Sequence, residues 1–309
     1  MNMEPTAIIG HKSICRFLKN ALDKHQESHA YLFLGQALIG KGVVAKWLAE
    51  QVAGPLASGK NLIWLDPAAG IRIADIRKLR SDLSLTNPFG GYRVAVLRRA
   101  EKMTPEAQNA FLKILEEPKT PVVFILTAET KKGLLPTVVS RVQLVRFSPV
   151  PKQLITESLL CDGVAPEVAE RATAMSLGCP GKAKALSQAD NLNLAEKWPR
   201  EIVALFSQWP HQRFRAAYQV LEAEEIDIFR DSAETVWRDL WLSRQGGRSD
   251  IVNVGLRSEI AGLAKRLSLA QIARGLQAVK NWNYLQARHV NKKLLLESFM
   301  LKAFPSNII

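Results

Sequence analysis

The chain has 309 residues, 47% of them hydrophobic and 23% charged, with a formal net charge of +13. This length is too great for one ordinary core and predicts a globular protein of two or three domains. The charge favours a polyanionic partner such as nucleic acid, an anionic surface or the acidic face of another protein, although scattered basic residues also fit a merely soluble surface.

The cysteines and the first residues limit the class of protein further. Cys15, Cys161 and Cys179 are few and widely spaced, which matches neither a disulfide framework nor a zinc site. We expect three buried thiols and no metal. The segment MNMEPTAIIGHK lacks the pattern of a secretory signal, and no stretch approaches the roughly 18 apolar residues of a membrane span. The expectation is a cytoplasmic protein with no membrane partner.

The first predicted elements are a helix, a strand, a glycine loop and a second helix. Apolar residues recur at helical spacing over residues 13–25, with Ser13 as the expected N-cap. The run AYLFLG predicts a buried strand that ends at a glycine. VVAKWLAEQVAG, after Lys41, predicts a helix closed by Gly54.

Strands and helices continue to alternate. NLIWLDP and residues 92–100 (YRVAVLRRA) predict strands with the helix IADIRKLRSDLSL between them. TPEAQNAFLKILEEP predicts a helix with Thr104 as N-cap and Pro105 at the first helical position, and VVFILTA predicts a fourth strand. Residues 1–149 should therefore form an α/β domain with a mostly parallel sheet flanked by helices.

The rest of the chain is predicted to be helical. Short segments such as PEVAERATAMSL and GKAKALSQA predict a small helical domain over residues 150–195, and longer amphipathic helices predict an all-α domain over 196–309. The apolar faces of the last helices fit either packing on partner chains or a self-contained bundle. We expect Trp237, Trp241 and Trp282 in the core rather than as base-stacking platforms.

The loop GQALIGKG has the spacing of a phosphate-binding loop with one omission. Gly35, Gly40 and Lys41 fit the pattern, but Gly42 stands where a hydroxyl would bind magnesium. A strand before the loop and a helix after it would still direct backbone amides at an anion, so residual nucleotide or phosphate binding stays open. The alternative is a glycine-rich turn that is needed only for a sharp bend.

The second magnesium ligand is also absent from its expected place. A hydrolase of this design carries an acid at the end of the third strand, where this chain has Arg98 and Arg99. Two cations there would repel magnesium. Glu101 is nearby but falls past the expected strand tip, which disfavours it as a ligand. Because both halves of the metal site are degraded, we expect no ATP hydrolysis by the chain itself.

Several segments, in order, resemble the clamp-loader branch of the AAA+ proteins, and above all its delta-prime family. They are HAYLFLGQALIGKG, IRIADIRKLRSDLSLTNPFGGYRVAVLRRAEKM, NAFLKILEEPKTPVVFILTAET and LLPTVVSRVQ, followed by SLGCPGKAKAL and NKKLLLESFMLKAF. The last two are similar to the start of a lid-domain helix and to a final collar helix. The resemblance implies an AAA+ α/β domain, a small helical lid domain and a helical collar domain that holds a ring together.

The resemblance also implies a function. Clamp loaders of a bacterial replicative DNA polymerase are five-subunit rings that place a sliding clamp on primed DNA. The implied partners are motor (gamma or tau) and delta subunits in a hetero-pentamer, the sliding clamp and primer-template DNA. Delta-prime subunits commonly hydrolyse nothing and require no cofactor, because the ATP is bound by the neighbouring subunit.

One arginine is expected to act in that neighbouring site. The family's Ser-Arg-Cys motif corresponds here to Ser140 and Arg141, with Val142 in place of the cysteine. A guanidinium supplied in trans can stabilise charge on the transferred phosphoryl group. A small apolar residue at the cysteine position should leave that task intact. The alternative is an ordinary surface arginine after the fourth strand.

Two further departures concern ATP and zinc. Motor subunits of the family carry an arginine at the start of the lid helix, where this chain has Gly181 with Lys182 beside it. The family's usual zinc-binding insertion is missing, because residues 54–61 are short and contain no cysteine. We therefore expect no zinc and a third degraded ATPase element.

DNA contacts should involve phosphates, because a loader accepts any sequence. Arg77, Lys78 and Arg80 are candidates by analogy with related loaders, and a solvated helix face is the alternative. Two other functions stay open. An active motor-type ATPase is disfavoured by the degraded metal site, and a stand-alone basic DNA-binding protein is disfavoured by the collar-like C-terminal helices.

Overall fold

The computed structural model describes residues 8–24, 26, 28–53, 61–67, 70–84, 92–118, 120–247, 251–286 and 290–304. The chain divides into two compact units, one of Met1–Gly163 with Gly178–Ala183 and one of Val164–Leu177 with Lys184–Ile309. The three domain boundaries expected from the sequence stay a prediction. None of the helices in the described ranges is long and apolar enough to cross a membrane.

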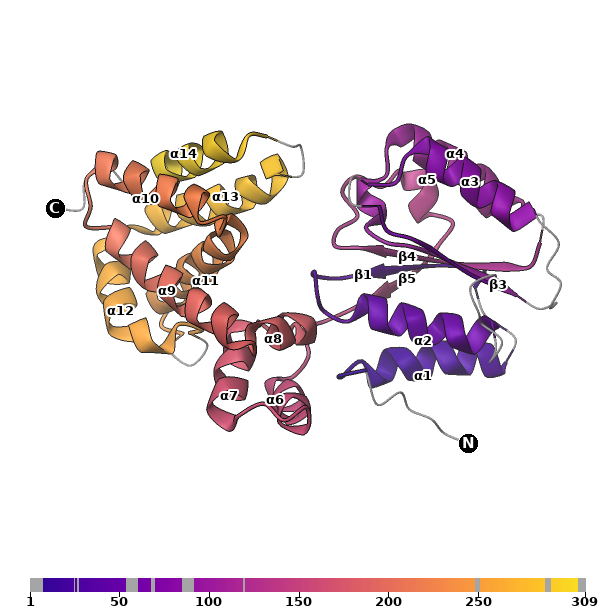
Figure 1. Ribbon diagram of the computed structural model, residues 1–309, viewed down its shortest axis with the longest axis horizontal. Helices are drawn as coiled ribbons and strands as arrows, with labels where there is room; N and C mark the ends of the chain where they lie inside the picture. Colours follow the sequence, from indigo (N-terminus) through magenta and orange to yellow (C-terminus); the bar gives the residue numbers. More distant parts are fainter. Residues whose placement is uncertain are drawn as a thin grey trace. The chain divides into compact units, whose positions relative to one another are not determined.

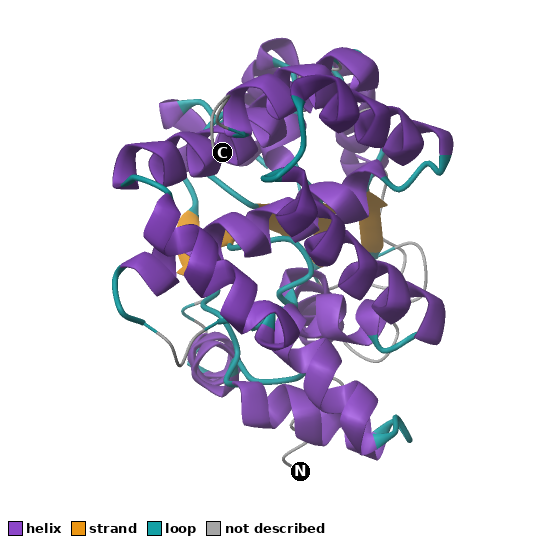
Figure 2. Cartoon of the chain, turned by 90° about the vertical axis from the view of Figure 1, so that its left-hand side faces the viewer, coloured by secondary structure: helices purple, strands orange, loops and turns teal. Residues whose placement is uncertain are grey.

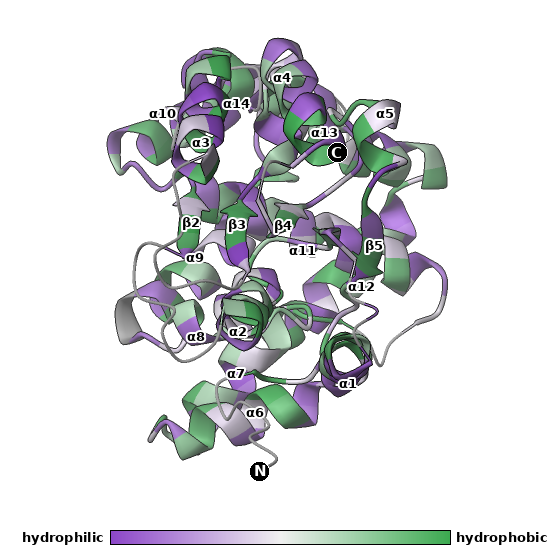
Figure 3. Cartoon of the chain, turned by 90° about the vertical axis from the view of Figure 1, so that its right-hand side faces the viewer, coloured by the Kyte–Doolittle hydropathy of each residue, from purple (hydrophilic) through white to green (hydrophobic). Residues whose placement is uncertain are grey.

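A parallel five-stranded sheet lies at the centre of the first unit, in the order β2-β3-β4-β1-β5 (Figure 1). The strands are β1 (Ala30–Leu34), β2 (Leu62–Leu65), β3 (Arg93–Leu97), β4 (Val122–Ala128) and β5 (Gln143–Arg146). A parallel sheet needs cover on both faces, so its central strands are continuous apolar runs. All five residues of β3 are buried, and the strand is mainly hydrophobic in Figure 3. The α/β class is confirmed.

Helices cover both faces of this sheet (Figure 1). The first face carries α1 (Lys12–Asp23) and α2 (Lys41–Ala53), and the second carries α3 (Ile73–Ser84), α4 (Pro105–Glu116) and α5 (Pro136–Val139). Because successive strand residues point to opposite faces, Tyr31 and Phe33 of β1 enter the first core and Leu32 enters the second. The unit also contains the 3₁₀ helix η1 (Ala100–Lys102) and α6 (Lys152–Cys161).

The described residues of the second unit form helices joined by loops and include no strand (Figure 2). Its helices are α7 (Pro166–Met175), α9 (Ala189–Leu205), α10 (Pro210–Glu222), α11 (Ile226–Arg244), η2 (Val254–Leu256), α12 (Arg257–Arg266), α13 (Leu269–Gln286) and α14 (Lys292–Ala303), and α8 (Pro180–Leu186) begins in the first unit. Trp237 and Trp282 are buried in one core, and Trp241 packs against it. The three tryptophans are therefore core residues, as predicted.

Three local predictions were wrong. Helix α1 begins at Lys12, so Ser13 lies inside it; His11 precedes the helix in a left-handed conformation and its Nε2 contacts the Ile39 carbonyl oxygen at 2.9 Å. Strand β3 ends at Leu97, because the chain turns into η1 through a left-handed residue. Cys161 is exposed at the last residue of α6.

Other boundaries agree with the sequence. Thr104 caps α4, since its Oγ1 accepts a hydrogen bond from the Ala107 amide at 3.2 Å, and Pro105 is the first helical residue. Of the other two cysteines, Cys179 is buried as predicted, whereas Cys15 is only half-buried. Gly54 and the rest of residues 54–60 lie outside the described residues, so the expected helix stop and the missing zinc insertion stay predictions.

Candidate functional site

The glycine loop connects β1 to α2 at the carboxyl edge of the sheet. Gly40 has a φ of 115°, which a glycine adopts without strain. A Cβ on Gly35 would lie 2.9 Å from the Phe147 carbonyl oxygen, so only glycine fits there. These two glycines are thus required by backbone geometry alone. Their presence therefore does not distinguish a phosphate-binding loop from a sharp turn that has no ligand.

Lys41 is turned onto its own loop. Its Nζ donates to the carbonyl oxygens of Gly35 and Gln36, the latter at 2.7 Å. Burial lowers the pKa of Lys41, and this outweighs the opposing effect of Glu129 and Glu101. A lysine that binds phosphate would have to give up these carbonyl contacts, so the loop is satisfied without an anion.

The start of α8 lies against the same loop, within the first unit. The Gly181 amide donates to the Leu38 carbonyl oxygen at 2.9 Å, and Cys179 Sγ donates to Gln36 Oε1 at 3.2 Å. A Cβ at Gly181 would lie 2.9 Å from that Leu38 oxygen. Position 181 therefore has no room for a side chain unless the backbone shifts, so the sensing arginine that the resemblance implies for motor subunits would not fit here.

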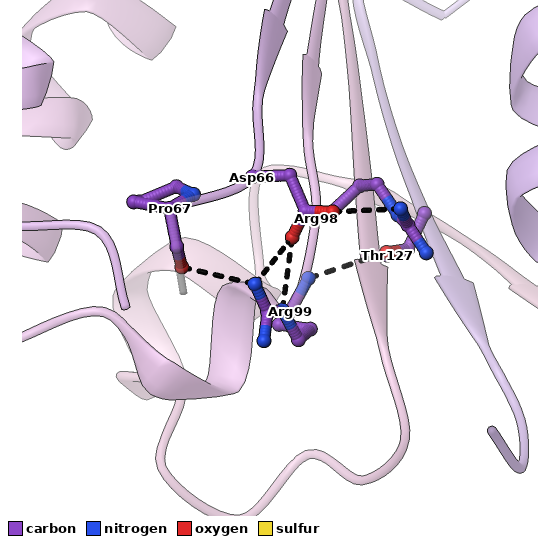
Figure 4. A network of polar contacts seen from close by, with 5 residues as sticks. All are labelled: Asp66, Pro67, Arg98, Arg99 and Thr127. Carbon is purple, nitrogen blue, oxygen red and sulfur yellow. Dashed lines mark hydrogen bonds and ion pairs between the residues drawn. The ribbon is translucent and has the colours of Figure 1, made fainter. Parts of the chain in front are cut away.

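The structure shows why Arg98 and Arg99 belong at this edge (Figure 4). Arg98 donates to Asp66 Oδ2 at 2.7 Å, and Arg99 donates to Asp66 Oδ1 through Nε at 2.9 Å and Nη2 at 2.6 Å. Arg99 Nη2 also binds the Pro67 carbonyl oxygen at 2.9 Å, and the Arg99 amide donates to Thr127 Oγ1 at 3.3 Å. Two guanidinium groups thus neutralise the acid that follows β2.

Sequence reasoning missed Asp66, although a signal for it existed. The acid directly follows the apolar run of β2, and β2 pairs in parallel with β3. The carboxyl ends of neighbouring parallel strands meet at one edge, where an acid after one strand can bind cations after the next. An Asp66 carboxylate held by two arginines is a poor magnesium ligand, since displacing them would leave both cations unpaired.

Glu101 lies in η1, past the end of β3, as the sequence spacing indicated. Its Oε2 is buried without a hydrogen-bond partner among the described residues. Burial raises the pKa of this carboxyl. No group of three His, Cys, Asp or Glu side chains suited to a metal occurs in the part of the chain that the structure describes. Glu101 is therefore a partly buried acid that interacts with Lys41 and Glu129 but does not belong to a metal-binding group among the described residues.

Replacing Glu101 by glutamine should change the pH dependence of stability. Because the folded-state pKa is raised, the folding penalty is absent at acid pH and grows as pH rises through that pKa. The Tm difference between Glu101→Gln and wild type should become more positive from pH 4 to pH 8. Thermal unfolding in matched buffers tests this, and a difference independent of pH would contradict it.

Ser140 and Arg141 follow α5 and are both exposed, which fits a residue that reaches a partner as well as an ordinary surface arginine. The loop before α5 is fixed by buried Gln108, whose Oε1 accepts from the Leu135 amide at 2.6 Å and whose Nε2 donates to the Gly133 carbonyl oxygen at 2.6 Å. Val142 is half-buried against the second core. The arginine is thus held at the end of a well-anchored short helix.

Arg141 also contacts α4, which the sequence did not indicate. Its Nη2 lies 2.6 Å from Glu116 Oε1, and its Nη1 donates to the Thr137 carbonyl oxygen at 3.1 Å. Arg77, Lys78 and Arg80 are exposed on α3, whose buried residues are Ile76, Leu79 and Leu83. Exposure agrees with both readings of these three cations, so their role in DNA binding stays a prediction.

Known proteins resemble this chain along most of its length. A family model described as "DNA polymerase III, delta subunit" matches residues 56–151. DNA polymerase III subunit delta' of Bacillus subtilis (strain 168) is 24% identical, over 93% of this chain and 94% of its own length. The subunit delta' of Escherichia coli (strain K12) is 27% identical, over 79% of this chain and 70% of its own length.

A solved structure supports the fold. The Thermotoga maritima RuvB Holliday junction branch migration motor aligns with a TM-score of 0.50 at 14% identity, over 96% of this chain and 88% of that one. At this identity the likeness concerns the AAA+ fold alone. The ordered motifs and the two delta' relatives agree: over most of its length the chain is similar to the delta' subunits of DNA polymerase III.

Proposed function

We propose that this chain is a non-hydrolysing clamp-loader subunit that supplies Arg141 to the ATP site of a neighbouring motor subunit. The observation that carries the first half is the pair Arg98 and Arg99 bound to Asp66, where a working site would hold magnesium. Gly42 removes the other ligand. A site without magnesium ligands cannot neutralise the charge that develops on a transferred phosphoryl group.

The ATP site that Arg141 would complete belongs to a neighbouring motor subunit. In it, Arg141 reaches the terminal phosphate of ATP bound by a motor (gamma or tau) subunit, and its guanidinium stabilises the transition-state charge. The ring would contain this chain, motor subunits and a delta subunit, and would place a sliding clamp on primer-template DNA. The similarity to delta' subunits and the exposure of Arg141 support this arrangement.

In this proposal, the glycine loop of the chain does not need a bound nucleotide. Lys41 is bonded to loop carbonyls and Gly181 to Leu38, so the loop is stable without a ligand. We also propose that the net charge of +13 attracts the phosphates of DNA, whatever the DNA sequence. Arg77, Lys78 and Arg80 are its first candidates.

Replacing Gly42 by threonine restores the missing hydroxyl and tests whether this single change is enough for ATP hydrolysis. Gly42→Thr should be tolerated, because nothing lies within 4 Å of a Cβ at this position. We expect the purified variant to hydrolyse ATP no faster than wild type or the control Gly42→Ala, since Arg98 and Arg99 still occupy the second magnesium position. Phosphate release above a protein-free blank is the measurement. Sustained turnover by Gly42→Thr would favour the motor-type ATPase instead.

A further inference from the structure

The side chain of Arg141 is folded back onto its own chain rather than extended from it. Nη2 forms the ion pair with Glu116, the last residue of α4. Nη1 donates to the Thr137 carbonyl oxygen at 3.1 Å and lies 3.4 Å from Ser140 Oγ. Both terminal nitrogens of the guanidinium are thus engaged within α4, α5 and the residue that follows α5.

These are the atoms that a reaching arginine presents to phosphate. A guanidinium binds phosphate best as a fork, with two N–H groups on two oxygens. An Arg141 that reaches a neighbour's phosphate with its terminal nitrogens must therefore leave Glu116. The two side chains are 41% and 45% exposed, so water screens the pair and it holds the arginine weakly.

We propose that Glu116 is a positioning residue that keeps Arg141 retracted until the triphosphate of a neighbouring subunit competes for it. This inference rests on the proposed function of Arg141 in trans. A triphosphate carries more negative charge than one carboxylate and offers several acceptor oxygens, so it wins the exchange once the two subunits meet. Engagement of the arginine then depends on the neighbour holding ATP.

The chain offers a matched control next to Glu116. Glu117 is exposed, has the same charge and makes no ion pair with any described residue. Glu116→Gln and Glu117→Gln therefore change net charge equally at neighbouring positions, and only the first removes the pair with Arg141. A general electrostatic effect on the motor site would appear in both variants.

The experiment is single-turnover ATP hydrolysis by an assembly of this chain with its motor subunits. The motor subunits' own matching arginines are replaced by alanine, so that hydrolysis reports the site served by Arg141. If a weak pair holds the arginine back, its removal raises the engaged fraction and the rate by roughly 1.4- to 5-fold. Glu117→Gln should match wild type, and Glu116→Gln/Arg141→Ala should match Arg141→Ala.

The variants separate this inference from the function on which it rests. A normal rate for Arg141→Ala would refute the trans role itself. If Arg141→Ala is slow but Glu116→Gln is unchanged or slower than wild type, Glu116 does not retract the arginine. A gain from Glu116→Gln that persists without Arg141 also contradicts the proposal. Thermal unfolding of each isolated variant identifies a loss caused by misfolding, and a double-mutant cycle on Tm in the isolated chain measures the pair directly.

Discussion

Replacing Arg141 by alanine should lower the rate of ATP hydrolysis at the neighbouring motor site by on the order of 10³-fold or more. The guanidinium has its greatest effect on charge that develops in the transition state, so the chemical step should suffer more than ATP binding. Arg141 is exposed on an anchored helix end, and its loss leaves no buried cavity. The stability of the isolated chain should therefore change little.

The rate of ATP hydrolysis is measured in the assembly whose motor subunits carry alanine at their own matching arginines. ATP binding is measured separately. Arg141→Lys is the matched variant, because it keeps the charge but loses the planar fork and should recover little of the rate. Loss of ATP binding with an intact chemical step would show that Arg141 binds the ground state only. A rate within about tenfold of wild type would remove the arginine from the catalytic step.

Replacing Gly275 by alanine should destabilise the second unit by about 3 kcal/mol or more. Helix α13 approaches α11 so closely that a Cβ at Gly275 would lie 2.4 Å from Cε3 and Cζ3 of Trp237. Trp237 is fully buried and packs against Phe206 and Phe304, so it has little freedom to move away. Denaturant or thermal unfolding of the full chain measures the loss.

Gly262→Ala is the control, and its effect should have the opposite sign. Gly262 lies inside α12, and nothing lies within 4 Å of a Cβ there. Alanine in a helix interior should then stabilise the chain by roughly 0.5–1 kcal/mol. Equal effects of the two substitutions would show that the close approach of α13 to Trp237 does not determine the stability of the second unit.

Local and periodic signals predicted most of the first unit. The order of strand, glycine loop and helix follows from apolar runs and glycine positions, and the Thr104 cap follows from its local sequence. The fifth strand was not predicted, because β5 (QLVR) has only two apolar residues between polar ends, whereas the equally short β2 (LIWL) is a continuous apolar run. Ser13 was misassigned because the His11 side chain holds the turn before α1 through a contact 28 residues away.

The sequence predicted those residues of the candidate site that lie in one stretch of the chain. It missed the contacts between residues that are far apart in the sequence. The spacing of Gly35, Lys41 and Gly42 is visible in one stretch of sequence. The pairs that Asp66 forms with Arg98 and Arg99 join residues 32 and 33 positions apart, and they depend on the pairing of β2 with β3. Contacts of this kind require the tertiary fold, as do the contacts of α8 with the loop.

The most direct test of the central claim compares ATP hydrolysis by the purified chain with hydrolysis by its assembly with motor subunits. The claim is that this chain completes a neighbour's site and has no working site of its own. It predicts no measurable turnover by the chain alone, and turnover by the assembly that disappears when Arg141 is alanine and the motor arginines are silenced. Robust hydrolysis by the chain alone would contradict the claim and make the altered loop a working ATPase.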